Sequence, residues 1–465
     1  MMIEQSIGYK LINRWMQSRN IIPFDFQKSV WQAIDTNQCG IINAPTGCGK
    51  TYSVFLGTLI RYINQHPENF TNQKNIGLQL LWITPLRALA TDIAKAMQEV
   101  VEHIGLPWKI GIRNGDTNSQ ERIRQKKQTP EILIITPESL HLLLAQKNYP
   151  YFFSTLSVIA VDEWHELMGS KRGVQIELAL SRLKGINIQL NKEPLSVWGI
   201  SATIGNLVLA GEVLLSCFAS NHHDIRYIKA DQKKEIRITS ILPDDLEKYP
   251  WSGHLGLKLI HKVIPIIKKS SSTLIFINTR GMSERWYQEL LNYDPELSGQ
   301  IALHHGSIEQ ELRNWVEAAL HEKKLKAVVC TASLDLGVDF RPVDTVIQVG
   351  SPKGIARFLQ RAGRSGHQPD AISQIYFLPT HSLELVESVA LQQAAKEGIT
   401  ESKDPQMLCM DVLLQYLNTL AISEGFDPKI ILKEIKETYA YRDLDQNEWH
   451  AIIHFLLNGG KALKE

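Results

Sequence analysis

Short runs of apolar residues, rich in β-branched side chains, recur along the chain between longer stretches with helical spacing of their apolar positions. The runs lack the alternation of apolar and polar residues that marks a half-exposed strand. Strands of this kind are buried on both faces, as in parallel sheets covered by helices. We therefore predict strands at residues 41–43, 80–83, 132–135, 158–161 and 197–200, and again at residues 274–277, 301–303, 327–330, 346–349 and 375–378.

The predicted strands form two sets of five, which favours two successive α/β domains over one larger domain. Between the sets lies a polar and charged stretch, residues 228–255, which contains Pro243, Pro250 and Gly253. We place the first domain at residues 1–228 and the second at residues 229–400.

After residue 404 the strand pattern stops and three helices are predicted. Asp427 followed by Pro428 is typical of a helix start, and Asp445 with Glu448 has the spacing of a capping box. Three short helices followed by a glycine turn are typical of the beginning of a winged-helix module. Because the chain ends at Glu465, where a wing strand is expected, we predict an incomplete winged-helix domain at residues 405–465.

Composition narrows the class of protein. The chain has 465 residues, 44% of them hydrophobic, and a formal net charge of +1, so it lacks a uniformly basic surface for nucleic acid. No pair of cysteines has disulfide or zinc-site spacing, and no apolar run resembles a signal peptide or a membrane span. The five cysteines lie at positions 39, 48, 217, 330 and 409. We therefore expect a cytoplasmic protein that does not enter a membrane.

A phosphate-binding loop is predicted at residues 44–51, APTGCGKT, between the first predicted strand and a helix. Its glycines allow backbone N–H groups to turn toward phosphates, and the helix N-terminus adds positive potential. Lys50 is expected to contact the β- and γ-phosphates of ATP, and Thr51 to give its hydroxyl to Mg²⁺. The predicted nucleotide-binding residues are Ala44, Pro45, Thr46, Gly47, Cys48, Gly49, Lys50 and Thr51.

An acidic pair, Asp162 and Glu163, follows the predicted strand at residues 158–161. The carboxyl end of a buried strand lies at the ligand crevice of an open α/β sheet. Asp162 is therefore predicted to hold Mg²⁺, and Glu163 to polarise the water that attacks the γ-phosphate.

Two arginines three residues apart, Arg361 and Arg364, lie in the sequence QRAGRSGH at residues 360–367 of the second domain. A phosphate-binding loop with an acidic pair would also suit kinases, transporters and GTPases. The arginines favour an ATPase of two domains, in which an arginine finger stabilises the charge of the transferred phosphoryl group. We predict Arg364 as the finger and Arg361 as its supporting partner.

These motifs stand in the order of a known family. The chain resembles superfamily 2 DExH-box helicases, which implies two tandem RecA-like domains with mainly parallel sheets. The resemblance also places Gln27 against adenine, and Gly337 and Asp339 at the nucleotide. It rests on FDFQ at 24–27, APTGCGKT at 44–51, TPLRALA at 84–90, TPESL at 136–140, DEWH at 162–165, SAT at 201–203, FINTR at 276–280, TASLDLGVD at 331–339 and QRAGRSGH at 360–367.

Two further stretches, DEWHELMGSKRG at 162–173 and WSGHLG at 251–256, resemble the large-helicase-related (Lhr-type) group, and within it the ligase-associated DNA-damage-response DEXH helicases. This resemblance implies a DNA-repair motor that moves 3′ to 5′ on single-stranded or forked DNA, with a DNA ligase and a nuclease as partners. It also implies a further C-terminal region, which this sequence lacks. The chain departs from many helicases at two positions. Cys48 stands in the phosphate-binding loop where serine is usual. His367 stands where many helicases have a further arginine, so the finger assignment rests more heavily on Arg364.

Contacts with the nucleic-acid backbone are expected on both domains, without reading of bases. The candidates on the first domain are Thr84, Pro85, Arg87, Thr136 and Pro137, and those on the second are Arg280 and Thr331. The basic stretch at residues 109–127 is either part of the approach path or a solvated helix face.

The motor motifs leave three functions open. The first is an ATP-dependent DNA helicase or translocase, and the second is an RNA helicase. The third is a clamp that uses ATP only as a conformational ligand, which the joint presence of Glu163 and Arg364 disfavours.

Overall fold

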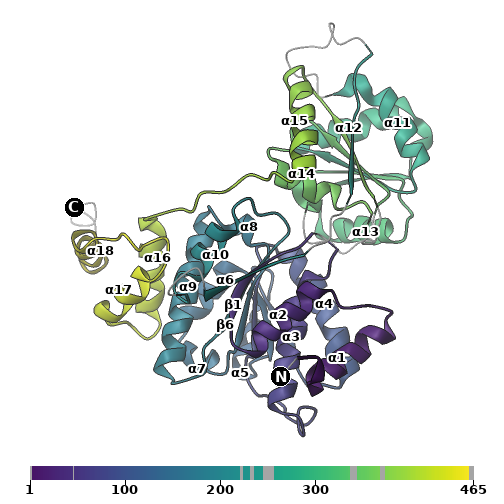
Figure 1. Cartoon of the computed structure of the whole chain (residues 1–465). Helices are drawn as coiled ribbons and strands as arrows, with labels where there is room; N and C mark the ends of the chain where they lie inside the picture. Colours follow the sequence, from purple (N-terminus) through teal and green to yellow (C-terminus); the bar gives the residue numbers. More distant parts are fainter. Residues whose placement is uncertain are drawn as a thin grey trace. The chain divides into compact units, whose positions relative to one another are not determined.

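The computed structural model describes residues 3–45, 47–219, 224–230, 235–244, 256–335, 343–366 and 372–459 (Figure 1). The chain divides into two compact units. The first comprises residues 1–44, 49–231 and 402–465, and the second comprises residues 45–48 and 232–401.

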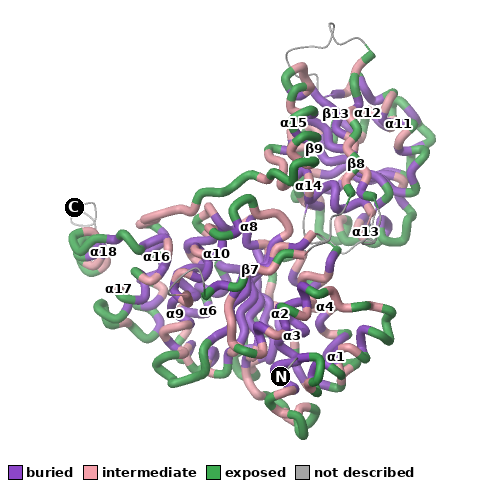
Figure 2. Tube along the Cα trace, in the orientation of Figure 1, coloured by how far each residue is buried: buried purple, intermediate pink, exposed green. Residues whose placement is uncertain are grey.

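The first unit is built on a sheet whose seven described strands all run parallel, in the order β3-β4-β2-β5-β6-β1-β7. The central strands are buried on both faces, as their apolar sequences predict (Figure 2). The strands are β1 Cys39–Asn43, β2 Leu80–Ile83, β3 Ile110–Arg113, β4 Ile132–Ile135, β5 Val158–Val161, β6 Ser196–Ser201 and β7 Ile225–Lys229.

Helices cover both faces of this sheet, with α1 to α4 on one side and α6 to α10 on the other (Figure 1). Side-chain caps start several of them, for example Ser6 before α1 and Ser170 before α9. The helices are α1 Ile7–Ser18, α2 Asp25–Asp35, α3 Lys50–Gln65, α4 Arg87–Ile104, α5 Ser119–Lys127, α6 Pro137–Leu144, α7 Tyr149–Phe152, α8 Trp164–Leu167, α9 Lys171–Gln189 and α10 Leu207–Leu215, preceded by the 3₁₀ helix η1 Ile3–Gln5.

The second unit has a sheet of six described strands, also parallel, in the order β10-β11-β9-β12-β13-β8. Its strands are β8 Ile236–Ser240, β9 Thr273–Ile277, β10 Ile301–His304, β11 Ala327–Cys330, β12 Thr345–Val349 and β13 Ser373–Leu378. Its helices are α11 Ile260–Lys269, α12 Arg280–Tyr293, α13 Gln310–His321, α14 Ile355–Ala362 and α15 Leu383–Glu397, with 3₁₀ turns η3 Leu257–Leu259, η4 Pro295–Leu297 and η5 Ala332–Leu334.

All ten predicted strands are present, so the α/β fold with two parallel sheets is confirmed. The sequence pattern missed β3, β7 and β8. These three lie at sheet edges, and β8 alternates between half-buried and exposed positions. Their polar residues interrupt the apolar runs on which the prediction relied.

The predicted C-terminal helices are α16 Met410–Ile422, α17 Pro428–Lys436 and α18 Gln446–Asn458. Asp427 accepts hydrogen bonds from two amides of α17, and Asp445 with Glu448 forms the predicted capping box. Glu465, where the wing strand is expected to begin, lies outside the described residues.

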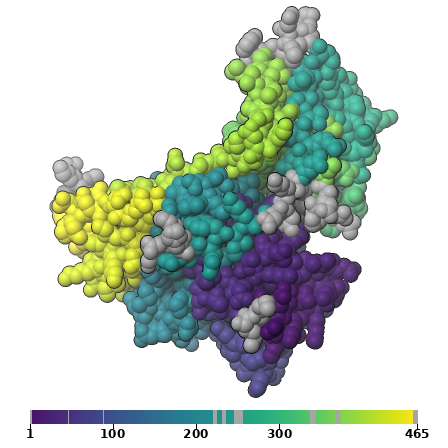
Figure 3. Space-filling model, in the orientation of Figure 1, coloured from purple at the N-terminus to yellow at the C-terminus, as the bar shows by residue number. Residues whose placement is uncertain are grey.

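These helices pack on the first unit. Apolar residues of α16 to α18 join the core that includes α6 and α9. In Figure 3 they form a continuous surface with residues of the first unit. Arg182 of α9 makes a buried ion pair with Glu434 of α17 at 2.5 Å, and Glu177 accepts a hydrogen bond from the Ala440 amide at 2.9 Å.

No helix among the described residues is long and apolar enough to cross a membrane.

The buried ion pair between Arg182 and Glu434 is expected to stabilise the packing of α17 on α9. Replacing Arg182 by leucine leaves the Glu434 carboxylate buried without its partner, which costs about 3–5 kcal/mol. Hydrogen exchange of the Ile431 and Ile435 amides measures the free energy of opening α17. The control is Lys184→Leu, which breaks the more exposed pair between α9 and Glu437, the residue directly after α17, and should cost at most about 1 kcal/mol. Equal effects of the two variants would contradict the prediction.

The buried carboxyl of Glu177 is expected to make the stability of the protein depend on pH. Burial raises the pKa of its carboxyl from 4.5 to about 8, although backbone hydrogen bonds oppose the shift. A raised folded-state pKa means that the folded protein binds the proton more tightly than the unfolded chain. The contribution to stability is therefore complete below pH 4.5 and is lost as the pH rises to about 8. The urea midpoint of the parent should fall relative to that of Glu177→Gln between pH 5 and pH 8; parallel pH profiles of the two proteins would refute this.

Candidate functional site

The phosphate-binding loop joins β1 to α3. Gly47 and Gly49 have φ angles of 87° and 70°, in the left-handed region that glycine enters without strain. The Ala44 amide donates to the Ser201 carbonyl at 3.1 Å, which fixes the start of the loop to β6. Helix α3 begins at Lys50, so its N-terminal amides follow the loop directly. Cys48 is buried, and Thr46 lies outside the described residues.

Gln27 supports this loop from α2. Its amide nitrogen donates to the Gly49 carbonyl at 3.0 Å, and its amide oxygen accepts from the Phe24 backbone at 2.9 Å. The side chain is buried. Gln27 therefore lies beside the nucleotide loop, as its motif requires, while its predicted contact with adenine stays a prediction.

Asp162 and Glu163 follow β5 at the carboxyl edge of the sheet. Asp162 is only 6% exposed and accepts a hydrogen bond from the Glu163 amide at 2.9 Å. Burial, together with the charge of Glu163 and against the charge of Lys50, raises the pKa of the Asp162 carboxyl to about 7. Lys50 and the acidic pair are thus close enough to interact.

This carboxylate pair fits a divalent cation. Two neighbouring acids, one of them buried, carry more negative charge than Lys50 compensates, and Mg²⁺ prefers oxygen ligands of this kind. Among the described residues no three His, Cys, Asp or Glu side chains group as a metal site.

His165 connects the acidic motif to the next strand. Its Nδ1 lies 2.8 Å from Ser201 Oγ and 3.4 Å from Glu163 Oε2. Burial lowers the pKa of the imidazole, which favours the neutral form of the ring. Ser201 Oγ also accepts from the Thr203 amide at 3.3 Å, which links the DEWH and SAT motifs through one hydroxyl.

Two of the candidate nucleic-acid motifs follow the adjacent strands β2 and β4. The hydroxyls of Thr84 and Thr136 are buried, and their amides donate to carbonyls of neighbouring strands. The amides are thus used within the sheet and are not free for a phosphate. Arg87 is exposed and pairs with Asp116 at 2.8 Å. Pro137 is the first residue of α6.

Arg172 ties these two motifs together, a role that the sequence alone did not assign. One nitrogen of its guanidinium donates to the Pro85 carbonyl at 2.9 Å, and the group makes two hydrogen bonds to the Glu138 carboxylate, at 2.6 and 3.2 Å. Burial acts to raise the pKa of the Glu138 carboxyl, but the hydrogen bond from Arg172 outweighs it, and this pKa is lowered. Arg172 belongs to the DEWHELMGSKRG stretch, but its partners lie 87 and 34 residues away.

In the second unit the two arginines contact different atoms of Asp335. Arg361 is 1% exposed and makes a bidentate ion pair with the Asp335 carboxylate, with hydrogen bonds of 2.6 and 2.9 Å. Its guanidinium lies over the Phe276 ring. Arg364 donates to the Asp335 backbone carbonyl at 2.9 Å. Arg361 thus anchors the residue that also contacts Arg364, consistent with a supporting part.

The remaining candidates of this unit lie at the carboxyl ends of β9 and β11. Arg280 is exposed at the start of α12, and Thr331 is half-buried after β11. Gly337, Asp339, His367 and the stretch at residues 251–255 lie outside the described residues.

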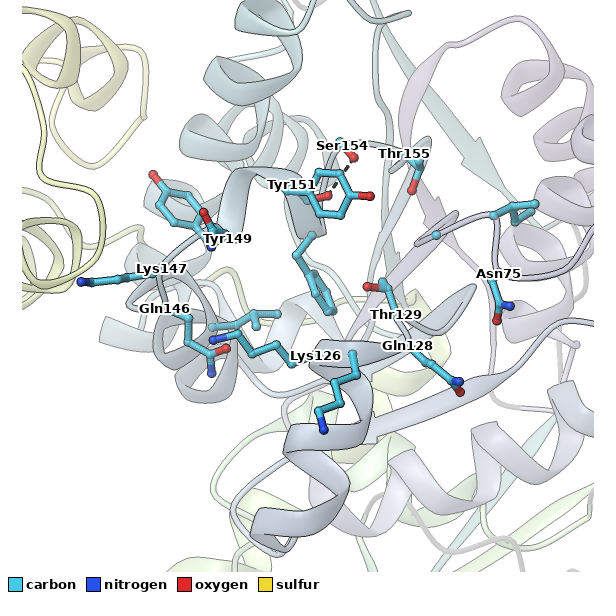
Figure 4. Close-up of a pocket in the computed structure, with 16 residues that line it drawn as sticks. Asn75, Lys126, Gln128, Thr129, Gln146, Lys147, Tyr149, Tyr151, Ser154 and Thr155 are labelled. Atoms are coloured by element: carbon cyan, nitrogen blue, oxygen red, sulfur yellow. Dashed lines mark hydrogen bonds between the residues drawn. The ribbon is translucent and has the colours of Figure 1, made fainter.

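An open hollow of about 500 Å³ lies at the other edge of the first sheet, before β2, β4 and β5 (Figure 4). Lys126 and Lys127 from the basic stretch line it together with Lys147, Tyr149 and Tyr151. None of the predicted site residues lines this hollow. The carboxyl edge, where the motifs gather, is the position at which open α/β sheets bind ligands.

Comparison with known families gives three matches along the chain. The DEAD/DEAH box helicase profile matches residues 24–209, the helicase conserved C-terminal domain matches residues 257–368, and the winged-helix domain of large helicase-related protein matches residues 393–465.

Among individual proteins, the ATP-dependent helicase Lhr-Core of Methanocaldococcus jannaschii is 33% identical over 90% of this chain and 49% of its own length. The Lhr helicase/uracil glycosylase of Escherichia coli is 28% identical over 93% of this chain and 31% of its own length. The chain therefore spans half or less of these relatives.

Among solved structures, the helicase Lhr of Mycobacterium smegmatis bound to single-stranded DNA and AMP-PNP is similar, with a TM-score of 0.81 and 28% identity. The match covers 96% of this chain and 57% of that one. The helicase MrfA bound to DNA has a TM-score of 0.73 over 89% of this chain and 57% of that one; at 22% identity it supports the fold alone. Two RecA-like domains with their motifs in order, followed by an Lhr-type winged-helix segment, show that the chain belongs to the superfamily 2 DExH-box helicases of the large-helicase-related group.

Proposed function

We propose that this chain is the motor of an ATP-dependent DNA helicase or translocase. The observation that carries the proposal is one cluster at the carboxyl edge of the first sheet. There the phosphate-binding loop, the Asp162–Glu163 pair and the His165–Ser201 contact lie together. ATP binding has additional support from the AMP-PNP in the M. smegmatis structure.

In this proposal each residue of the cluster has a separate task. Lys50 contacts the β- and γ-phosphates, and Thr51 with Asp162 holds Mg²⁺. When bound, the ion neutralises charge on the phosphates. Glu163 orients and deprotonates the attacking water. Its Oε2 is buried and has no hydrogen-bond partner among the described residues, so this acceptor is available to a water molecule. The contact between His165 and Ser201 holds the turn that follows Glu163 in place.

Arg364 is proposed as the arginine finger for the γ-phosphate. The Arg361–Asp335 pair holds the backbone carbonyl to which Arg364 donates, so it sets the starting position of the finger. Loss of Arg361 would leave the Asp335 carboxylate buried without its main partner.

Single-stranded DNA is the proposed track, on the basis of the DNA in the related M. smegmatis complex. Arg87, Arg280 and Thr331 are the proposed backbone contacts, because their side chains are exposed or half-buried at the carboxyl ends of strands. A place in DNA repair, 3′ to 5′ movement and action beside a ligase and a nuclease follow from the resemblance to ligase-associated helicases.

The first test replaces Glu163 by glutamine and measures steady-state ATP hydrolysis with single-stranded DNA or RNA of the same length. We expect DNA to stimulate the parent more than RNA, and the variant to bind ATP but hydrolyse it about 100- to 1000-fold more slowly. The control is Glu166→Gln, which changes the other acid near His165, at 3.5 Å from its Nε2, and should stay within a few-fold of the parent.

Each outcome separates the candidate functions. Greater stimulation by RNA would favour an RNA helicase. Nucleotide binding without hydrolysis by the parent would favour an ATP-switched clamp, and hydrolysis by Glu163→Gln at the parental rate would remove Glu163 from the catalytic role.

The second test addresses Arg172. Replacing it by methionine removes the link between Pro85 and Glu138, so both motifs lose their fixed position, and we expect the Kd for single-stranded DNA to rise about tenfold. Fluorescence anisotropy with a labelled oligonucleotide measures this. The neighbouring Lys171→Met, which breaks only an exposed pair with Asp411, is the matched control. An unchanged Kd for Arg172→Met would exclude the positioning role.

A further inference from the structure

The chain leaves the first unit after residue 231, builds the second unit, and returns to the first at residue 402. We propose that the return segment, residues 401–404, is a positioning strap for ATP hydrolysis. It links the helix that carries Arg361 to the turn that carries His165, through Glu401 and Lys403. This inference rests on the proposed ATPase function and adds two positioning residues to it.

Lys403 holds the acidic motif from outside. Its Nζ donates a hydrogen bond to the His165 carbonyl at 2.7 Å. Helix α8, which contains His165, has only four residues, so a cation at its carbonyl end satisfies an acceptor that the helix itself leaves open. His165 is also the residue that contacts Ser201 and Glu163. The lysine thus steadies the turn on which the water-activating carboxylate depends.

The backbone of the strap lies directly on the loop after α8. A Cβ atom at Gly169 would come within 2.8 Å of the Asp404 carbonyl oxygen. Gly169 also has a φ of 76°, which other residues adopt only with strain. Because glycine has no side chain, the backbone of the strap can pass this close to the loop. Downstream, the Leu408 amide donates to the Ala440 carbonyl at 2.9 Å and ties the segment to the C-terminal helices.

Glu401 makes the corresponding contact within the second unit. Its carboxylate accepts a hydrogen bond from the Ala356 amide at 2.9 Å, in the first turn of α14. A negative charge at a helix N-terminus is favourable, because the first amides have no partner within the helix. Helix α14 carries Arg361, and Arg364 follows two residues after its end.

Chain continuity joins these contacts. Glu401 and Lys403 are two positions apart, so the bond to the arginine helix and the bond to the acidic motif belong to one short piece of backbone. Each contact lies within its own unit. A change at α14 can therefore reach the hydrolytic turn through this short piece of backbone.

The test compares Lys403→Met with Lys403→Arg in the full chain, and uses Lys396→Met, an exposed lysine in the last turn of α15, as the matched control. We expect Lys403→Met to lower the DNA-stimulated kcat about tenfold, with KM for ATP within about twofold, because ATP binding residues are untouched. Lys403→Arg should recover most of the rate, and Glu401→Gln should act in the same direction as Lys403→Met. Melting temperatures check that all variants are folded.

A second readout does not depend on catalysis. Hydrogen exchange at the amides of α8 and Met168 should be several-fold faster in Lys403→Met than in the parent or Lys396→Met. Unchanged exchange and kcat in Lys403→Met would overturn the strap, as would failure of Lys403→Arg to restore either. If the parent itself lacks nucleic-acid-stimulated hydrolysis, the proposed function fails, and the exchange experiment still decides whether Lys403 holds the turn.

Discussion

Parallel hydrogen bonding between strands is the constraint on which the site depends. In the described part of the first sheet, β1, β6, β5, β2 and β4 run in one direction, so their carboxyl ends share one edge. The phosphate loop follows β1, the acidic pair follows β5, and Ser201 ends β6. Residues that are far apart in sequence therefore meet without long loops. The second sheet places its motifs by the same rule.

Buried charges show where the molecule is built for stability and where it is built for chemistry. Arg182 with Glu434, and Arg361 with Asp335, are buried pairs with direct hydrogen bonds, so each charge has its compensation in place. The pair Asp162 and Glu163 differs, because both members are acids and Lys50 compensates them only in part. Such a site is costly to fold alone and gains stability from a bound cation.

Helix α9 contacts both the motor motifs and the C-terminal helices. Arg172 in its first turn fixes the motifs after β2 and β4, while Glu177 and Arg182 further along fix the C-terminal helices. The C-terminal segment is therefore an extension of the first RecA-like unit in its packing. Lys403, just before the C-terminal helices, adds a direct contact with the DEWH motif at His165.

The sequence by itself determined the buried strands of the two sheets and the order of the motifs that follow them. The buried strands are continuous apolar runs, and the phosphate loop and acidic pair follow strands directly, so local pattern is enough to find them. The edge strands β3, β7 and β8 were missed because their polar residues hide the pattern. Only the tertiary structure decided that Gln27 supports Gly49, that Arg361 anchors Asp335, and that Arg172 and Lys403 hold motifs 87 and 238 residues away. Such roles depend on which surfaces meet after folding, and nothing in the local spacing of a residue specifies its distant partner.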